Sequence, residues 1–99
     1  MPYMGSRLVL AEKYVLGDGA IVEMKIWEVP PSRWTPDGFK YSLVYIGPDG
    51  NRLVGYDNAE GKGHHRHDAE GSAPFQFTTI DDLVEIFRAE VEKLRRKQQ

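Results

Sequence analysis

A period-two alternation of apolar and polar residues on both sides of a short glycine turn constrains the fold most. In residues 20–29, Val22, Met24 and Ile26 share one face of an extended chain. Residues 8–16 follow the same parity more loosely, and Gly17-Asp18-Gly19 lies between the two runs. Such alternation is typical of half-buried strands, and a tight glycine turn between two of them is typical of an antiparallel hairpin. The sequence therefore predicts a hairpin near its beginning.

Further strand and loop signals follow the hairpin. Residues 30–38 hold three prolines and a glycine, which exclude a central strand and indicate a loop. Residues 41–46 and 52–56 are predicted strands, joined by a turn that contains Pro48 and Gly50. Residues 59–74 have no hydrophobic periodicity and are expected to form a loop. Residues 75–77 fit either a short fifth strand or an extended entry to a helix.

The last segment is an amphipathic helix. Its apolar residues recur at helical spacing, and Thr78 or Thr79 can cap its start, ahead of two aspartates in the first turn. The stripe comprises Ile80, Leu83, Val84, Phe87, Val91 and Leu94. The predicted class is therefore α+β, an antiparallel meander sheet of four to five strands covered on one face by a C-terminal amphipathic helix. Residues 1–99 are expected to form a single α+β domain.

Composition excludes several classes of protein. Hydrophobic residues make up 40% and charged residues 28%, which is typical of a globular chain. No apolar run reaches the ~18–20 residues that span a bilayer, and the first residues do not resemble a secretory signal. The chain has no cysteine, so disulfides, thiolate zinc sites and cysteine nucleophiles are excluded. We expect a cytoplasmic protein.

Titratable chemistry is concentrated in one glycine-bracketed segment. All three histidines lie within four residues, at His64, His65 and His67, beside Lys62 and Arg66. Imidazole titrates near neutral pH, so two histidines can serve as general base and general acid. The cations can neutralise charge on a transferring phosphoryl group. Although the net charge of −2 gives no global reason to bind nucleic acid, the charge of this segment is locally positive.

These residue types suit metal-independent cleavage of RNA. The 2′-hydroxyl would attack the adjacent phosphate, with Asp57 orienting a histidine, and no cofactor is required. The expected catalytic residues are His65, His67, Lys62 and Asp57. The expected substrate-binding residues are Tyr56, Asn58, Arg66 and Trp34, with aromatic rings available to stack on a base.

Other interpretations remain open. His65 and His67 in an extended chain lie on one side and can share a metal ion with Asp57 or Asp68, which would suit a metal-dependent hydrolase. The segment also fits a solvated loop or a non-catalytic binding module. Trp34 fits both a loop anchor and an exposed contact for a partner.

The motifs resemble those of the TumE family, small toxins of prokaryotic toxin–antitoxin modules. The likeness runs from about Leu8 to the C-terminal helix, and its most specific part combines Tyr56-Asp57-Asn58, Gly61-Lys62-Gly63 and His65-Arg66-His67. One departure is His64, which stands where an acidic residue is expected, so His65 and His67 rank above it. The resemblance implies a cognate antitoxin as partner, often a helix-turn-helix protein. RNA as substrate is our inference from common toxin activities, and a homodimer formed through uncovered sheet surface stays open.

Overall fold

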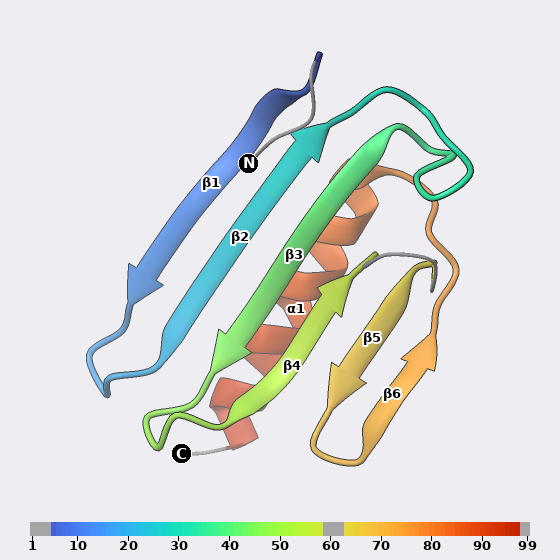
Figure 1. Cartoon of the computed structure of the whole chain (residues 1–99). Coiled ribbons are helices and arrows are strands. Elements are labelled where there is room, and N and C mark those ends of the chain that lie inside the picture. The colour runs from blue at the N-terminus through green and yellow to red at the C-terminus, as the bar shows by residue number, and fades with distance from the viewer. Residues whose placement is uncertain (1–4, 59–62, 98–99) are drawn as a thin grey trace.

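Residues 5–58 and 63–97 are described by the computed structural model, which has six strands and one helix (Figure 1). The strands form one antiparallel sheet in which each pairs with the next along the chain. The elements are β1 (Arg7–Val15), β2 (Ile21–Glu28), β3 (Phe39–Ile46), β4 (Arg52–Asp57), β5 (His65–Asp68), β6 (Gly71–Pro74) and α1 (Ile80–Lys97). The predicted α+β meander with a C-terminal helix is confirmed.

Two strands lie where a loop was predicted. β5 and β6 pair with each other, and β5 also pairs with β4, so the sheet has six strands rather than four or five. The prediction of a loop over residues 59–74 was wrong for this part, because backbone pairing and a turn at Asp68 hold the hairpin without an apolar face. The Oδ1 atom of Asp68 accepts a hydrogen bond from the Glu70 N–H at 2.8 Å. Residues 75–79 are not a strand but an extended entry to α1.

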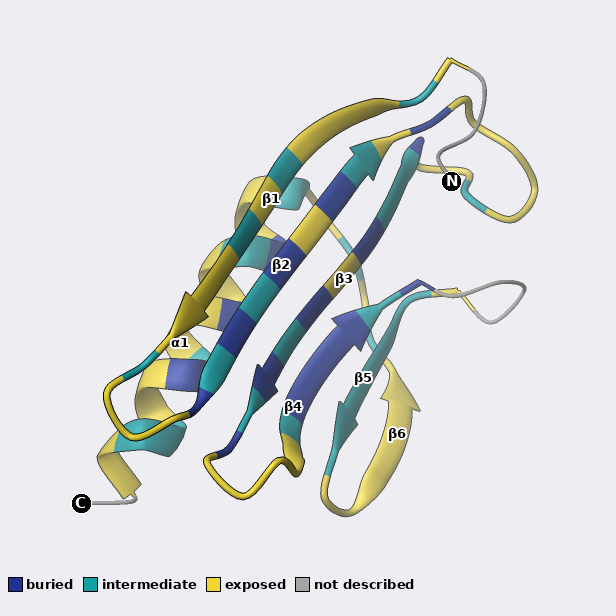
Figure 2. Cartoon of the chain, turned by 60° about the vertical axis from the view of Figure 1, so that its left-hand side comes forward, coloured by how far each residue is buried: buried dark blue, intermediate teal, exposed yellow. Residues whose placement is uncertain are grey.

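The core lies between α1 and one face of the sheet. Leu83, Phe87 and Val91 of α1 are buried against residues of β2, β3 and β4 that share one parity. Figure 2 shows the buried positions gathered on these three strands. Thr79 caps the helix, because its Oγ1 atom accepts the N–H of Asp82 at 3.1 Å. In the described part of the chain, no helix is both long and apolar enough to cross a membrane.

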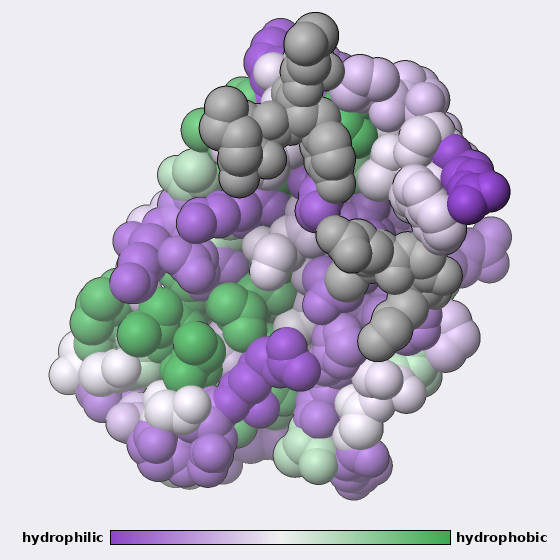
Figure 3. All heavy atoms as spheres, viewed as in Figure 1, coloured by the Kyte–Doolittle hydropathy of each residue, from purple (hydrophilic) through white to green (hydrophobic). Residues whose placement is uncertain are grey.

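None of the described residues forms a helix over the other face of the sheet, which we call the open face. In Figure 1 it points toward the viewer, with α1 behind the sheet. The cross-strand registers show that Lys25, Ser42 and Gly55, and the residues at alternate positions from them, lie on this face. In the same view, Figure 3 shows an apolar patch at the lower left, whereas polar residues cover most of the rest. The patch includes the cross-strand neighbours Val15, Ile21 and Ile46.

Candidate functional site

The register of β5 divides the histidine segment between the two faces of the sheet. His65 lies opposite Asp57 and His67 opposite Gly55, whereas Arg66 lies opposite Tyr56, which faces α1. Successive side chains of a strand point to opposite faces. His65 and His67 therefore lie on the open face, and Arg66 lies on the helix side.

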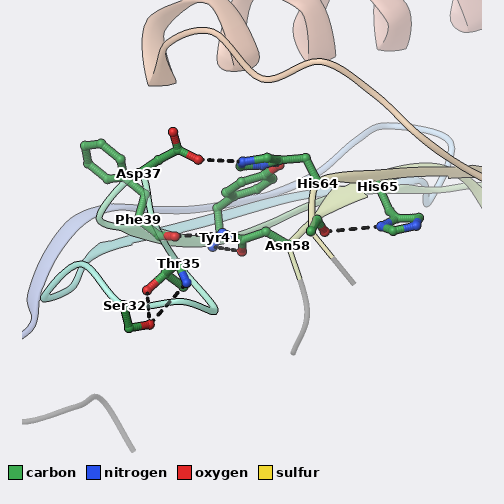
Figure 4. A network of polar contacts seen from close by, with 9 residues as sticks. Ser32, Thr35, Asp37, Phe39, Tyr41, Asn58, His64 and His65 are labelled. Carbon is green, nitrogen blue, oxygen red and sulfur yellow. Dashed lines mark hydrogen bonds and ion pairs between the residues drawn. The ribbon is translucent and has the colours of Figure 1, made fainter. Parts of the chain in front are cut away.

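The open face brings together three of the predicted catalytic residues. The rings of His65 and His67 lie side by side, with centroids 6.3 Å apart and an interplanar angle of 27°. The buried Nε2 atom of His67 lies 3.0 Å from Oδ2 of Asp57, an ion-pair distance at an angle outside the hydrogen-bond range. The Nδ1 atom of His65 lies 3.2 Å from the Gly63 carbonyl oxygen, the bond drawn at the right of Figure 4. Because that carbonyl is an acceptor, Nδ1 carries the proton and Nε2 is left for chemistry.

Arg52 is a cation at this site that the sequence interpretation missed. A Cβ atom at residue 55 would stand 3.3 Å from the Cδ atom of Arg52, so the arginine stem lies over the bare backbone of Gly55. Gly55 is directly opposite His67. The absence of a side chain at residue 55 therefore lets a guanidinium group approach the histidine pair.

The open face extends the site across neighbouring strands. The register places His65, Asp57, Ser42 and Lys25 in one cross-strand row, and Lys40 lies two residues before Ser42 on the same face. On these strands the residues at alternate positions are apolar and face α1. The sequence alternation therefore already indicated that the polar residues face the other side. Only the register shows which of them come level with His65.

Arg66 belongs to an ion-pair cluster that ties α1 to the sheet. Its guanidinium donates to both carboxylate oxygens of Glu90, and to Oδ2 of Asp68 at 2.6 Å. The Tyr56 hydroxyl donates to Oε1 of Glu90 at 2.6 Å. Burial opposes ionisation of Glu90, but the hydrogen bonds from Arg66 and Tyr56 outweigh it and lower the pKa of this carboxyl. Burial and the bond to Glu90 raise the pKa of Tyr56 to about 12.

The structure thus separates Arg66 and Tyr56 from the histidine pair with which the sequence grouped them. Arg66 is committed to two carboxylates, and its bond to Glu90 raises its pKa. Tyr56 is only 4% exposed and packs edge-on against Phe75 and Phe87. Both side chains hold the fold together.

His64 is fixed within a polar and aromatic network on the helix side (Figure 4). Its Nδ1 and Nε2 atoms lie 2.8 Å from the Tyr41 hydroxyl and from Oδ2 of Asp37. Its ring stacks on Phe77 with centroids 4.5 Å apart. Burial, and then the charges of Asp57 and Asp37, raise the pKa of Tyr41, so the hydroxyl stays protonated and donates to Nδ1. The order carboxylate, imidazole, hydroxyl resembles a nucleophile triad, but Tyr41 is only 4% exposed.

Asn58 and Trp34 lie at the same end of the sheet with different roles. Asn58 is 5% exposed, accepts the Tyr41 N–H at 3.0 Å and donates to the Phe39 carbonyl at 2.7 Å. It therefore ties the first residues of β3 to the end of β4. Trp34 is 52% exposed, with the Arg33 guanidinium 4.4 Å above its ring. Trp34, Asp37, Asn58 and His64 line a small pocket of about 230 Å³.

Two further observations concern the predicted chemistry. Lys62, a predicted catalytic residue, lies outside the described residues. Among residues 5–58 and 63–97, no group of three or more histidine or carboxylate side chains is arranged to hold a metal ion.

Comparison with known proteins places the chain in a class of toxins. The family model described as Toxin TumE matches residues 5–95, nearly the whole chain. No curated protein and no solved structure matches the chain. The chain therefore belongs to the TumE toxin family, and its class is that of the toxin component of a toxin–antitoxin system, with a cognate antitoxin as partner.

Proposed function

We propose that this toxin is a metal-independent endoribonuclease whose acid/base pair, His65 and His67, acts on the open face of the sheet. The observation that carries the proposal is the convergence of two imidazoles, Asp57 and the Arg52 stem at one place with no helix over it. A base and an acid that each form a hydrogen bond of about 3 Å to one phosphodiester lie about 6 Å apart. The 6.3 Å between the rings therefore suits two histidines that act on one phosphodiester.

The proposed reaction uses the two rings in different roles. Nε2 of His67 is buried and faces the Asp57 carboxylate at 3.0 Å, so Nδ1 is the proposed base. It takes the proton of the RNA 2′-hydroxyl while O2′ bonds to phosphorus. The bond from phosphorus to O5′ breaks, and protonated His65 gives its Nε2 proton to the leaving O5′. The products are a 2′,3′-cyclic phosphate and a 5′-hydroxyl end. The sequence interpretation gave the neutralisation of phosphoryl charge to Lys62 and Arg66. Lys62 keeps this proposed role, and Arg52 replaces Arg66 in it.

The surroundings suit a single-stranded RNA. Lys25 and Lys40 share the open face with the histidine pair, and cations there can follow a phosphate backbone. Trp34 exposes about half of its surface at the end of the sheet nearest His65, where a base can stack. We therefore keep Trp34 as a substrate-binding residue, and we assign Tyr56, Asn58 and Arg66 to structure.

Three broader proposals accompany the ribonuclease proposal. We infer that the antitoxin is a helix-turn-helix protein, because such antitoxins often accompany toxins of this kind. We also infer that the toxin acts in the cytoplasm, where RNA substrates are found. A homodimer formed through uncovered sheet surface stays a prediction, whose simplest basis is the apolar patch of the open face at Val15, Ile21 and Ile46.

A cleavage assay tests the ribonuclease proposal. Purified toxin is incubated with total cellular RNA in EDTA, and 2′,3′-cyclic phosphate ends are counted. We expect His65→Ala and His67→Ala each to lower the rate by roughly 10²–10⁴-fold, since that is the usual contribution of a general acid or base. Arg52→Gln should also slow cleavage, whereas Arg96→Gln, on the exposed side of α1, should not.

Three results would contradict the proposal. Cleavage that survives the double variant His65→Ala/His67→Ala would remove the pair from the mechanism. Cleavage that stops in EDTA and returns with a divalent metal would favour a metal-dependent hydrolase. RNA or antitoxin binding without any cleavage by the unaltered toxin would favour a non-catalytic binding module.

A further inference from the structure

A groove runs between β1 and α1 on the helix side of the sheet. It consists of two adjoining hollows of about 600 and 420 Å³, and Arg88 and Glu92 of α1 line both. Its floor is apolar, with Leu10 and Ile26 under one hollow and Val22 and Met24 under the other. Figure 2 shows β1 exposed along most of its length in front of α1.

The width of the sheet explains the groove. Packed helices lie 8–10 Å apart and neighbouring strands about 4.8 Å apart, so one helix covers roughly two strands. The buried side chains of α1 pack with those of β2, β3 and β4, and β1 extends beyond them. Among the described residues, two exposed large apolar side chains of β1, Val9 and Tyr14, line the groove. The space beside α1 therefore has the dimensions that a second helix needs.

Charge along the groove is uneven. Arg88 pairs with Glu12, and Arg96 pairs with Glu92. The positive and negative charges therefore balance in the middle of the groove and at its far end. Asp81 and Glu85, one helical turn apart, line the end of the groove near the start of α1. Within the described residues, neither carboxylate has an ion-pair partner. The groove thus offers two acidic side chains beside an apolar floor.

We propose that this groove binds an amphipathic α-helix of the cognate antitoxin, with its apolar stripe on Val9, Leu10 and Tyr14 and with basic residues beside Asp81 and Glu85. The inference rests on membership of the toxin family and is independent of the ribonuclease proposal. The groove lies on the opposite side of the sheet from His65 and His67, so the two sites can be tested separately.

The edge of β1 favours a helix over the other occupants. A strand added to β1 would meet the irregularity between Leu8 and Leu10, and Lys13 lies on this edge strand. Both features disfavour edge pairing. A second copy of the chain would have to supply α1, the helix that the described residues contain, and the apolar stripe of α1 is already buried. The antitoxin therefore supplies the helix.

Binding of the purified antitoxin encoded beside this toxin tests the inference, measured by calorimetry with matched pairs of variants. Val9→Asp changes the groove, and Leu8→Asp changes a neighbour of similar exposure, 47% against 44%, which lies opposite Trp27 and outside the groove. Glu85→Arg changes the acidic end, and Glu23→Arg changes the open face. We expect Val9→Asp and Glu85→Arg each to raise Kd by about tenfold or more, and the two controls by less than about threefold.

Charge exchange gives the decisive outcome. The antitoxin should carry a lysine or arginine that faces Glu85. Changing that residue to Glu should restore tight binding to the toxin variant Glu85→Arg. If Val9→Asp does not fold, as judged by circular dichroism, Glu85→Arg still tests the groove because it alters an exposed side chain.

Three results would overturn the inference. The first is unchanged binding by Glu85→Arg. The second is antitoxin protection of β1 amides from hydrogen exchange without sensitivity to Glu85→Arg, which would indicate strand addition. The third is self-association of the toxin alone that Val9→Asp abolishes, which would assign the groove to a second copy.

Discussion

Alternation along β5 gives neighbouring residues different functions. His64 and Arg66 point to the helix side, where every nitrogen of the His64 ring has a partner. His65 and His67 point to the open face, where His65 keeps Nε2 available. A shift of one residue in the pairing of β4 with β5 would reverse these assignments, because strand side chains repeat every two residues.

Replacing His64 should affect stability more than replacing His65. His64→Ala leaves the buried Tyr41 hydroxyl without its partner and removes the ring that stacks on Phe77. We expect the free energy of unfolding to fall by about 1–3 kcal/mol, measured by urea denaturation at pH 7. His65→Ala removes one contact to the Gly63 carbonyl and should change the free energy by less than about 0.5 kcal/mol. Equal losses in the two variants would contradict the structural role of His64.

At the scale of elements, a clamp made of Glu90, Arg66, Tyr56 and Asp68 ties α1 to β4 and β5. Glu90 of α1 receives Arg66 from β5 and Tyr56 from β4, and Asp68 holds the far side of the same guanidinium. The apolar stripe of α1 provides packing, whereas this cluster sets where along the sheet the helix lies. The clamp also fixes the face to which β5 presents its histidines.

The clamp should make stability depend on pH. Since the folded-state pKa of Glu90 is lowered below 4.5, its contribution is complete above that pH and is lost as the pH falls through the lowered value. We expect Glu90→Gln to lower the free energy of unfolding by about 1–3 kcal/mol at pH 7 and to weaken its further fall as the pH drops below 4.5. Urea denaturation at a series of pH values measures both effects. Glu92→Gln, which removes an exposed pair with Arg96, is the control and should cost less than about 0.5 kcal/mol. Similar curves for both variants would refute the clamp.

At the scale of the whole molecule, burial is uneven across the sheet. β2 and β3 are buried at alternate positions and β4 at three consecutive ones, but β6 is exposed throughout and β5 is intermediate. The strand that carries the histidine pair therefore lies at the weakly packed side of the molecule. Local opening requires least free energy where few apolar side chains are buried.

Hydrogen exchange of the native toxin should show this difference. Amides of β5 and β6 are expected to exchange through local opening, with free energies about 2 kcal/mol or more below those of β2, β3 and α1. Exchange followed by NMR at neutral pH measures each amide. A single free energy common to all strands would contradict the prediction and indicate that the hairpin opens only when the whole chain unfolds.

The sequence by itself determined the class of fold and most element boundaries. The alternation in residues 20–29 and the helical stripe from Ile80 to Leu94 each bury one face, so periodicity alone identified them. β5 and β6 were missed because His65–Asp68 and Gly71–Pro74 bury no apolar face and are held by backbone pairing. Among the predicted site residues, His65, His67 and Asp57 converge, whereas Arg66 and Tyr56 face the other way.

Tertiary structure alone decided which residues meet. The spacing of His65 and His67 showed that they share a face, but the register of β5 on β4 brought them to Asp57 and to the space over Gly55 that Arg52 fills. Arg66 has a structural role because it pairs with Glu90, which lies 24 residues away in the sequence. No local sequence pattern connects the two residues. Periodicity reports only whether a residue lies on an apolar or polar face. Contacts between distant residues depend on register and helix placement, which the packing of the whole chain sets.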